Sequence, residues 1–283
     1  MKLKIMEWNI HQQGRQWNGK TQTSNDGDIP LWIIDQISDD ISIVVLTEFN
    51  SHAKNIEEFY NKLMKKGFFY SSTNYSCGWA NDILIAVRGD AIVENVSFVK
   101  AYPDSPNTTF NIDWDAIPEN IRVDIRIEDK LVHLWGIRIK DLKSNYEKRS
   151  NEMEMLVHWI KEVDGINYLV GDFNNLREDT HITDWNLIVL DNLLGANFER
   201  ITPKNHSWGV SKLVSDNTFD GYIKNDHFIY SKGDIKSVTA EEYKWTYLKN
   251  CQYTLEEGKF GKNKLNIPVG EPDHGILIVE VYI

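Results

Sequence analysis

Short apolar runs rich in β-branched and aromatic residues recur along the whole chain and limit what it can fold into. Each run has about the length of a β-strand, and turn-forming residues bound most of them. We predict eight strands, at Leu3–Ile10, Ile41–Phe49, Asp82–Val87, Ile121–Ile127, Leu131–Ile139, Asn167–Gly171, His227–Ser231 and Gly275–Tyr282. Because these runs are spread evenly, we expect an α/β fold without a domain break, and therefore a single domain over residues 1–283.

Helical periodicity separates some of these runs. Apolar residues recur on one face at 31–37, 56–64 and 156–163, which predicts three amphipathic helices. The polar stretch Thr21–Asp28 and the proline-containing stretch Tyr102–Asn120 predict loops. The expected chain is thus strand-rich, with few helices.

The charge balance argues against one form of nucleic-acid binding. The 283 residues include 42 acids and 31 Lys or Arg, which gives a formal net charge of −11 at pH 7. A protein that binds nucleic acid by broad neutralisation of phosphates is usually basic. A surplus of carboxylates fits a different strategy, in which divalent cations meet the phosphate for the protein.

The cysteine content and the apolar runs bear on the cellular compartment. With only Cys77 and Cys251, the chain can build neither a disulfide framework nor a cysteine-based zinc site. No stretch has the roughly 18 apolar residues of a membrane span, and the N-terminal residues include Glu7 but no long apolar run. We therefore expect a reduced, cytoplasmic setting, without a signal peptide or membrane contact.

A match to a phosphate-binding loop lies near the N-terminus but lacks the structure that such a loop needs. Residues 14–21 fit the pattern G-x-x-x-x-G-K-[ST]. In a genuine P-loop a helix begins at the Lys-Thr pair, so that its N-terminus and the loop amides hold the phosphates. Here a polar stretch follows, and the next helical pattern starts near Pro30. We interpret the match as a coincidental surface loop, in which Arg15 and Lys20 remain candidates for substrate contact.

A second pattern is more informative, because acids and amides stand where the predicted strands begin or end. These residues are Asn9, Glu48, Asp172, Asn174, Asp226 and the pair Asp273-His274. Strand ends are rigid mounts, and side chains there can converge on one edge of a sheet. The oxygens of Asn9, Glu48 and Asp273 suit Mg²⁺ or Mn²⁺. His274, next to an acid, is able to carry charge or transfer a proton.

The spacing of Asp172 and Asn174 favours a shared role. In an extended segment, residues two apart point to the same side, so an acceptor and a donor would lie together to orient a water and hold a phosphoryl oxygen. Each residue also has an ordinary interpretation: Asn9 as a strand-end hydrogen bonder, Glu48 as a solvated loop residue, Gly-Asp-Phe-Asn as a turn and Asp-His as a cap. The ordered set, and not any single member, carries the functional hypothesis.

The same set resembles a known family. The chain is similar to the endonuclease/exonuclease/phosphatase superfamily, which has the deoxyribonuclease-I-like fold, in its succession of Trp8-Asn9, Thr47-Glu48, Gly171-Asp172-Phe173-Asn174, Asp226 and Asp273-His274. The segment His206-Ser207-Trp208 also resembles the aromatic-Thr-Trp element of many members. The resemblance runs from Leu3 to Val281. It implies a four-layer α/β sandwich, in which two mixed, largely antiparallel sheets pack face to face with helices outside.

The resemblance also implies an activity and a metal site. Members of the family cleave phosphoesters with Mg²⁺ or Mn²⁺, on nucleic acids, inositol phosphates, sphingomyelin or smaller nucleotides. By this resemblance Glu48 is the principal metal ligand, with Asn9 beside it and Asp273 nearby.

Catalytic and substrate-binding roles follow from the same resemblance. Asp172 is expected to orient or deprotonate the attacking water, and Asn174 to hold a non-bridging phosphate oxygen. His274 is expected to bind the scissile phosphate or to act as acid and base, with Asp226 orienting it. Trp208 is a candidate for substrate contact.

One residue departs from the family pattern. The segment 134–140 resembles the family strand that usually presents a His or Tyr to the site, and Arg138 occupies that place. A guanidinium stays protonated and cannot be a general acid near neutral pH, but it can bind phosphate through two hydrogen bonds. Arg138 therefore stabilises charge on the phosphorus, marks a slower or specialised chemistry, or simply pairs with a neighbouring acid.

The substrate is the least constrained part of the prediction. We predict a metal-dependent nuclease or phosphodiesterase that acts on nucleic acid by in-line water attack, with Arg15, Lys20 and the aromatic segment Trp245–Tyr253 as candidates for phosphate contact and base stacking. Those aromatics equally suit core packing. The alternative is a phosphatase or phosphodiesterase for inositol phosphates, lipid headgroups or small nucleotides. A non-catalytic binding module and a P-loop ATPase are two further classes, and no stable protein partner is inferred.

Overall fold

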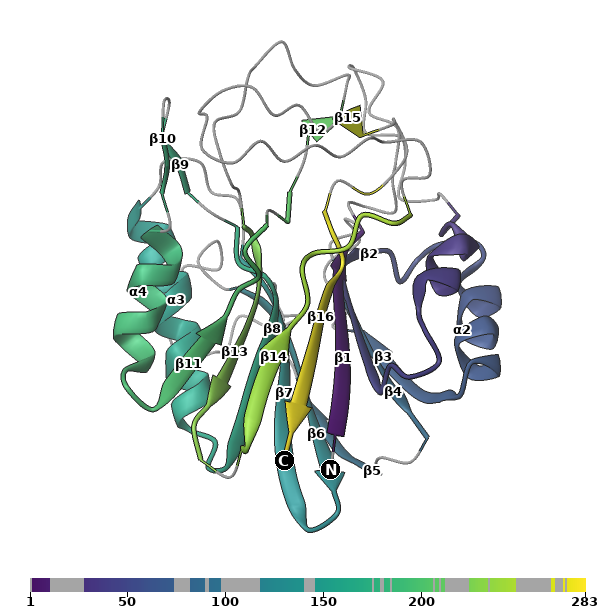
Figure 1. Cartoon of the computed structure of the whole chain (residues 1–283), viewed down its shortest axis with the longest axis horizontal. Helices are drawn as coiled ribbons and strands as arrows, with labels where there is room; N and C mark the ends of the chain where they lie inside the picture. The colour runs from purple at the N-terminus through teal and green to yellow at the C-terminus, as the bar shows by residue number, and fades with distance from the viewer. Residues whose placement is uncertain are drawn as a thin grey trace, which may run out of the picture.

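Two six-stranded β-sheets form the centre of the structure, which is a computed structural model (Figure 1). It describes residues 2–283 except for 11–27, 74–81, 90–91, 98–117, 140–145, 175, 179–180, 184, 206, 209, 212–223, 234, 248–265, 268–271 and 273. The two chain termini lie close together at one edge of the sheets (Figure 1).

The first sheet has the strand order β14-β16-β1-β2-β4-β3. The central pair β1 and β2 is parallel, and all other neighbours in this sheet are antiparallel. Its strands are β1 (Lys2–Asn9), β2 (Ile43–Phe49), β3 (Phe68–Thr73), β4 (Asp82–Arg88), β14 (Ser237–Ala240) and β16 (Leu277–Tyr282).

The second sheet repeats this plan with the strand order β11-β13-β8-β7-β6-β5. Here β7 and β8 form the parallel pair. Its strands are β5 (Ile92–Ser97), β6 (Glu119–Ile127), β7 (Lys130–Arg138), β8 (Ile166–Asp172), β11 (Phe198–Ile201) and β13 (Asp226–Ser231). Two small pairs lie apart from the sheets: β9 (Leu176–Glu178) with β10 (His181–Thr183), and β12 (Val210–Ser211) with β15 (Asn266–Ile267).

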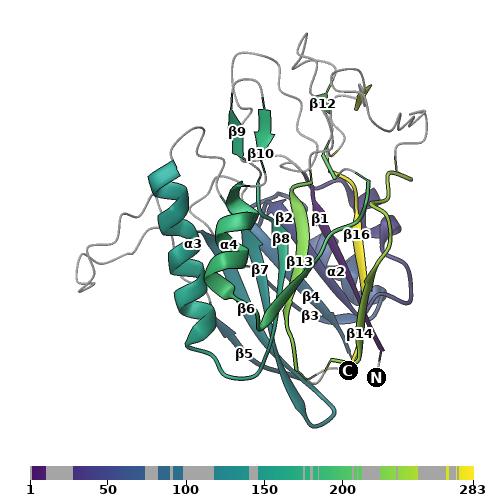
Figure 2. The ribbon, with the colours of Figure 1, turned by 60° about the vertical axis from the view of Figure 1, so that its left-hand side comes forward.

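Helices cover the outer faces of both sheets and complete four layers. The 3₁₀ helix η1 (Leu31–Gln36) and the helix α2 (Ile56–Lys65) pack outside the first sheet, and α3 (Tyr146–Lys161) and α4 (Trp185–Leu194) pack side by side outside the second (Figures 1 and 2). This arrangement confirms the predicted four-layer sandwich of two mixed, largely antiparallel sheets. The prediction of a single domain over residues 1–283 stays a prediction.

Side-chain alternation along the strands produces three apolar layers between the four structural ones. On β1, Ile5 packs between the two sheets, whereas Met6 and Trp8 point to the other side and pack with η1 and α2. The third layer joins the outer face of the second sheet to α3 and α4 through residues such as Leu169 and Leu156. Burying one such side chain stabilises a fold by about 1.5–3 kcal/mol, so these layers hold the sheets in fixed relation.

Some elements differ from the sequence-based expectation. The segment 31–37 forms a short 3₁₀ helix instead of an α-helix. It ends at Gln36, since Ile37 already has extended backbone angles (φ −81°, ψ 107°). The predicted loop Tyr102–Asn120 is wrong at its end, since Glu119 and Asn120 begin β6. The predicted loop at 21–28 falls almost entirely outside the described residues. None of the helices in the described part of the chain has the length and apolar character that crossing a bilayer requires.

Candidate active site

Strand ends from both sheets meet at the edge opposite the two termini. From the first sheet, β1 ends at Asn9, β2 carries Glu48 near its end, and His274 lies just before β16. From the second sheet, β7 ends at Arg138, β8 ends at Asp172 and β13 begins at Asp226. Strand register aligns the second group, because Asp172 is the partner of both Arg138 and Asp226. The structure thus brings together the predicted residues Asn9, Glu48, Arg138, Asp172, Asn174, Asp226 and His274.

Gly171 lets the end of β8 approach β7 closely. Its φ of +150° is rarely adopted by residues with a side chain, and a Cβ atom there would lie 1.9 Å from the carbonyl oxygen of Ile137. The glycine before Asp172 is therefore required by the backbone itself. It places the Asp172 side chain at the edge where the two sheets meet.

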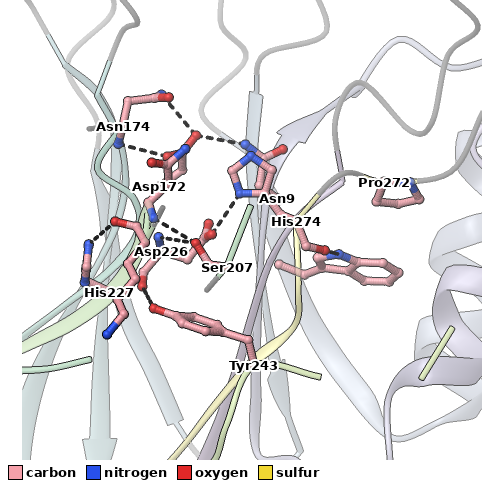
Figure 3. A network of polar contacts seen from close by, with 12 residues as sticks. Asn9, Asp172, Asn174, Ser207, Asp226, His227, Tyr243, Pro272 and His274 are labelled. Carbon is pink, nitrogen blue, oxygen red and sulfur yellow. Dashed lines mark hydrogen bonds and ion pairs between the residues drawn. The ribbon is translucent and has the colours of Figure 1, made fainter. Parts of the chain in front are cut away.

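The carboxylate of Asp172 is the centre of a hydrogen-bond network (Figure 3). Its Oδ2 accepts hydrogen bonds from Nδ2 of Asn9 at 2.8 Å and from Nδ2 of Asn174 at 3.0 Å. Its Oδ1 accepts one from the backbone N–H of Asn174 at 2.9 Å. Because Asn9 comes from the first sheet, this network joins the two sheets directly.

Burial dominates the electrostatics of Asp172. Together with the nearby carboxylate of Asp226, it raises the pKa of Asp172 to about 7, although His274 and Arg138 act in the opposite direction. A carboxylate that titrates near neutral pH is well suited to accept a proton from water.

A turn of the backbone, and not an extended segment, brings the Asn174 side chain to Asp172. The segment does not stay extended, as the period-two geometry requires, because Asn174 has a left-handed backbone with φ +39°. The chain turns immediately after β8, and this turn folds the Asn174 side chain back onto Asp172. The turn is held from outside, since Nδ2 of Asn174 also donates to the carbonyl of Ile139 at 2.7 Å and Nη1 of Arg149 donates to the carbonyl of Asn174 at 3.0 Å.

Asp226 and His274 form a second buried pair across the sheets. Nδ1 of His274 lies 2.8 Å from Oδ2 of Asp226, and both side chains are almost completely buried. The backbone N–H of Asp226 donates to Oγ of Ser207 at 3.3 Å, and the hydroxyl of Tyr243 donates to its carbonyl (Figure 3). The backbone of Asp226 is therefore held in place beside the imidazole.

The backbone of His274 is held equally firmly. Its carbonyl accepts hydrogen bonds from Nε1 of Trp8 at 2.9 Å and from the hydroxyl of Tyr247 at 2.7 Å. Trp208 forms an isolated antiparallel bridge with His274 and is partly exposed. This places the backbone of the predicted substrate-contact residue next to that of His274.

Arg138 pairs with an acid, which was one of its three interpretations. Its Nη2 lies 2.9 Å from Oε1 of Glu48, and its Nη1 lies 3.8 Å from Oε1 of Glu119. Glu48 has a left-handed backbone with φ +53°, and its Oε1 also lies 3.4 Å from Nδ2 of Asn9. Phosphate contact by Arg138 stays a prediction.

The donor chemistry of this edge fits a hard divalent cation. One ligand atom from each of Asp172, Asp226 and His274 lies within 4.8 Å of the others. Oδ1 of Asp226 is buried and has no hydrogen-bond partner among the described residues. Carboxylate and amide oxygens, here with Glu48 and Asn9, are the ligands that Mg²⁺ and Mn²⁺ prefer.

Several predicted residues lie outside the part of the chain that the structure describes. They are the proposed metal ligand Asp273, the candidate substrate contacts Arg15 and Lys20, the P-loop match at 14–21 and the cysteines Cys77 and Cys251.

Three residues near the site were not predicted. Glu7 is fully buried on β1, where its carboxylate lies near the side chain of Thr47. Burial, with Asp226 and Asp172 nearby, raises the pKa of Glu7 well above its usual range. Because Glu7 precedes Asn9 by two positions on a strand, the period-two pattern could have identified it. For Arg149 and Glu119 the sequence offers no comparable signal.

Among the comparisons with known proteins, only the comparison of structures finds matches. No protein-family model matches the sequence, and no curated protein matches it either.

Solved structures match the whole chain at low sequence identity. TDP2 from D. rerio, in a complex with a single-strand DNA product, is 13% identical with a TM-score of 0.57, covering 100% of this chain and 99% of that one. An endonuclease/exonuclease/phosphatase family protein from Bacteroides thetaiotaomicron is 14% identical with a TM-score of 0.57, covering 99% and 97%. The mannosyl-6-phosphatase Bt3783 of the same species is 14% identical with a TM-score of 0.54, covering 99% and 100%. The chain thus has the deoxyribonuclease-I-like fold that these solved structures share.

Proposed function

We propose that the protein is a divalent-metal-dependent phosphoester hydrolase that cleaves nucleic acid by in-line attack of water. The observation that carries the proposal is the buried cluster in which Asn9 contacts Asp172 and His274 contacts Asp226. Four polar side chains from distant parts of the chain meet where ordinary packing would place apolar groups. Burying such groups costs free energy, which function explains better than stability.

Glu48, Asn9 and Asp273 would hold the cation. When bound, such an ion neutralises phosphate charge and stabilises the leaving oxygen. The Asn9 amide, which also contacts Asp172, links this ligand set to the proposed base. We also infer that the enzyme works in the cytoplasm, from the two cysteines of its sequence.

Asp172 is the group that accepts the proton of the attacking water. Its two hydrogen bonds from Asn174 and one from Asn9 fix the carboxylate, and its raised pKa strengthens it as a base. The proximity of Asn174 suits it to hold a non-bridging phosphate oxygen.

His274 binds the scissile phosphate or donates a proton to it through Nε2. Nδ1 faces Asp226, so the anionic carboxylate favours a proton on that nitrogen and stabilises an imidazolium. A cationic imidazole next to Trp208 would attract a phosphate group at the rim of the site.

Nucleic acid is the first substrate class to test. The TDP2 structure with a single-strand DNA product has the same fold, which supports this choice. The alternative is a small phosphomonoester or phosphodiester, such as an inositol phosphate, lipid headgroup or small nucleotide. The net charge of −11 and the fold shared with a mannosyl-6-phosphatase favour that alternative.

A substrate screen tests the proposal. Plasmid DNA, single-stranded DNA, RNA, bis-p-nitrophenyl phosphate and inositol phosphates are incubated with the protein, with Mn²⁺ or with chelator. We expect metal-dependent product release that Glu48→Gln and Asp172→Asn each reduce by about 10²-fold or more. Glu94→Gln is the control, because Glu94 pairs with Arg126 on an exposed surface. Hydrolysis that survives chelator, or wild-type turnover in either site variant, would refute the assignment.

A further inference from the structure

Arg138 holds the carboxylate that we propose as the principal cation ligand. Its Nη2 and Nε lie 2.9 Å and 3.3 Å from the same atom, Oε1 of Glu48. Its Nη1 lies 3.8 Å from Oε1 of Glu119. The side chains of Arg138 and Glu48 are each only 12% exposed, so the pair is largely shielded from water.

The two acids that flank the guanidinium come from different sheets. Glu119 is the register partner of Arg138 in the antiparallel pair β6 and β7, so the backbone fixes it beside the arginine. Glu48 comes from β2 in the first sheet and meets Arg138 only across the interface between the sheets. Arg138 therefore has two acidic neighbours that its own sheet fixes, Glu119 and Asp172, and a third, Glu48, that a ligand could take from it.

Arg138 cannot leave Glu48 by losing its proton. Burial opposes its charge, but Glu48, Glu119 and Asp172 more than offset this effect and raise the pKa of Arg138. The guanidinium thus stays cationic at every accessible pH. A metal ion that coordinates Oε1 of Glu48 must displace a positive charge that already uses the lone pairs of that oxygen.

We propose that Arg138 sets the affinity of the site for its divalent cation, by occupying Oε1 of Glu48 until the cation binds and then remaining with Glu119. This inference rests on the proposed function, because it takes Glu48 as a cation ligand. Arg138 is then a positioning residue that competes with the metal. The competition makes the site bind the metal more weakly than its carboxylates alone would.

Metal binding to the full-length protein tests this directly. Free Mn²⁺ is measured by electron paramagnetic resonance during titration of wild type, Arg138→Ala, Arg138→Gln and Arg126→Ala. We expect both Arg138 variants to bind Mn²⁺ about tenfold more tightly, within the usual range of coupling between two sites. Arg126→Ala removes an exposed Arg–Glu pair between β6 and β5 and should leave the affinity unchanged. Because Arg138→Gln keeps most of the side-chain volume, the test survives if Arg138→Ala fails to fold.

A double-mutant cycle separates competition from a general effect of charge. Glu119→Gln removes the acid beside which the guanidinium would remain after it leaves Glu48. In the protein with Arg138 present, Mn²⁺ binding should therefore weaken. In the Arg138→Ala background the same change should have little effect, because no guanidinium competes with Mn²⁺ for Glu48. An undiminished effect of Glu119→Gln in that background would contradict the proposal.

Glu48→Gln distinguishes this inference from the proposed function. If Glu48→Gln abolishes Mn²⁺ binding while the Arg138 variants bind like wild type or more weakly, only the role of Arg138 is overturned. If Glu48→Gln binds Mn²⁺ as well as wild type does, Glu48 is not a cation ligand, and the metal site of the proposed function falls together with the inference.

Discussion

Nδ1 of His274 lies 2.8 Å from Oδ2 of Asp226, and a similar pair occurs elsewhere, where Nδ1 of His133 lies 2.7 Å from Oδ1 of Asp124. The first pair crosses between the sheets at the candidate active site. The second joins register partners on β6 and β7, and Nε2 of His133 lies 3.0 Å from the carbonyl oxygen of Asp164. The molecule therefore contains a catalytic candidate and a matched structural counterpart.

Asp226→Asn should lower kcat by about 10²-fold or more, because His274 loses the anion that orients it and stabilises its charged form. Asp124→Asn makes the same chemical change in the other pair and should leave kcat near the wild-type value. Steady-state kinetics on the substrate found in the screen, with thermal unfolding of each variant, measures both effects. Equal losses of kcat in the two variants would contradict a catalytic role for the Asp226 pair.

Gly171→Ala should lower the free energy of unfolding by at least about 3 kcal/mol, because the new Cβ would collide with the carbonyl of Ile137. Gly233 is the control, since it has nearly the same φ, +152° against +150°, and a Cβ atom added there would meet nothing within 4 Å among the described residues. Gly233→Ala should cost only the backbone strain, about 1 kcal/mol. Chemical denaturation measures the difference. Similar losses of unfolding free energy in both variants would show that the close approach of Gly171 to β7 is unimportant.

His227 should make the protein less stable in acid. Burial lowers the pKa of His227 to about 3, and its neutral ring bridges Thr202 and the carbonyl of Lys224, each at 2.8 Å. Between pH 6.5 and pH 3 the unfolded chain binds a proton that the folded protein does not, so falling pH favours unfolding. This one residue should remove about 3 kcal/mol of stability between pH 7 and pH 4. Denaturation at several pH values should give a shallower pH dependence for His227→Gln, and an unchanged slope would contradict the assignment.

Arg149→Lys should lower kcat about tenfold with little change in KM, because the shorter amine supports the carbonyl of Asn174 less well. Lys161 offers a control on the same helix, since its Nζ donates to the carbonyl of Leu193 at 2.9 Å on an exposed surface. Lys161→Ala should leave both constants unchanged. A rise in KM alone for Arg149→Lys would indicate a substrate contact instead of support for the turn.

The sequence predicted where the polar groups stand but not all of their partners. Asn9, Asp172 and Asp226 mark strand ends as expected, because alternating apolar runs define those ends locally. The pairing of Arg138 with Glu48 joins positions 90 residues apart and depends on how the two sheets face each other. No local pattern contains that information.

Buried charges explain why the start of one helix was not predicted. The helix α3 begins at Tyr146, ten residues before the predicted segment, and its first turns bury Arg149 and Glu152. An amphipathic pattern cannot reveal a helix whose inner face is charged. Glu7 is a different case: one acid in an apolar strand resembles an exposed position, and only its period-two spacing from Asn9 indicates that it faces the site.

Three central contacts each join a residue from the side of the first sheet to one from the second. They are Asn9 with Asp172, Glu48 with Arg138, and His274 with Asp226. Hydrolysis should therefore report on the alignment of the layers. A small displacement of one sheet relative to the other would break these contacts and abolish hydrolysis. Circular dichroism would still record intact strands. On warming, activity should disappear before secondary structure does.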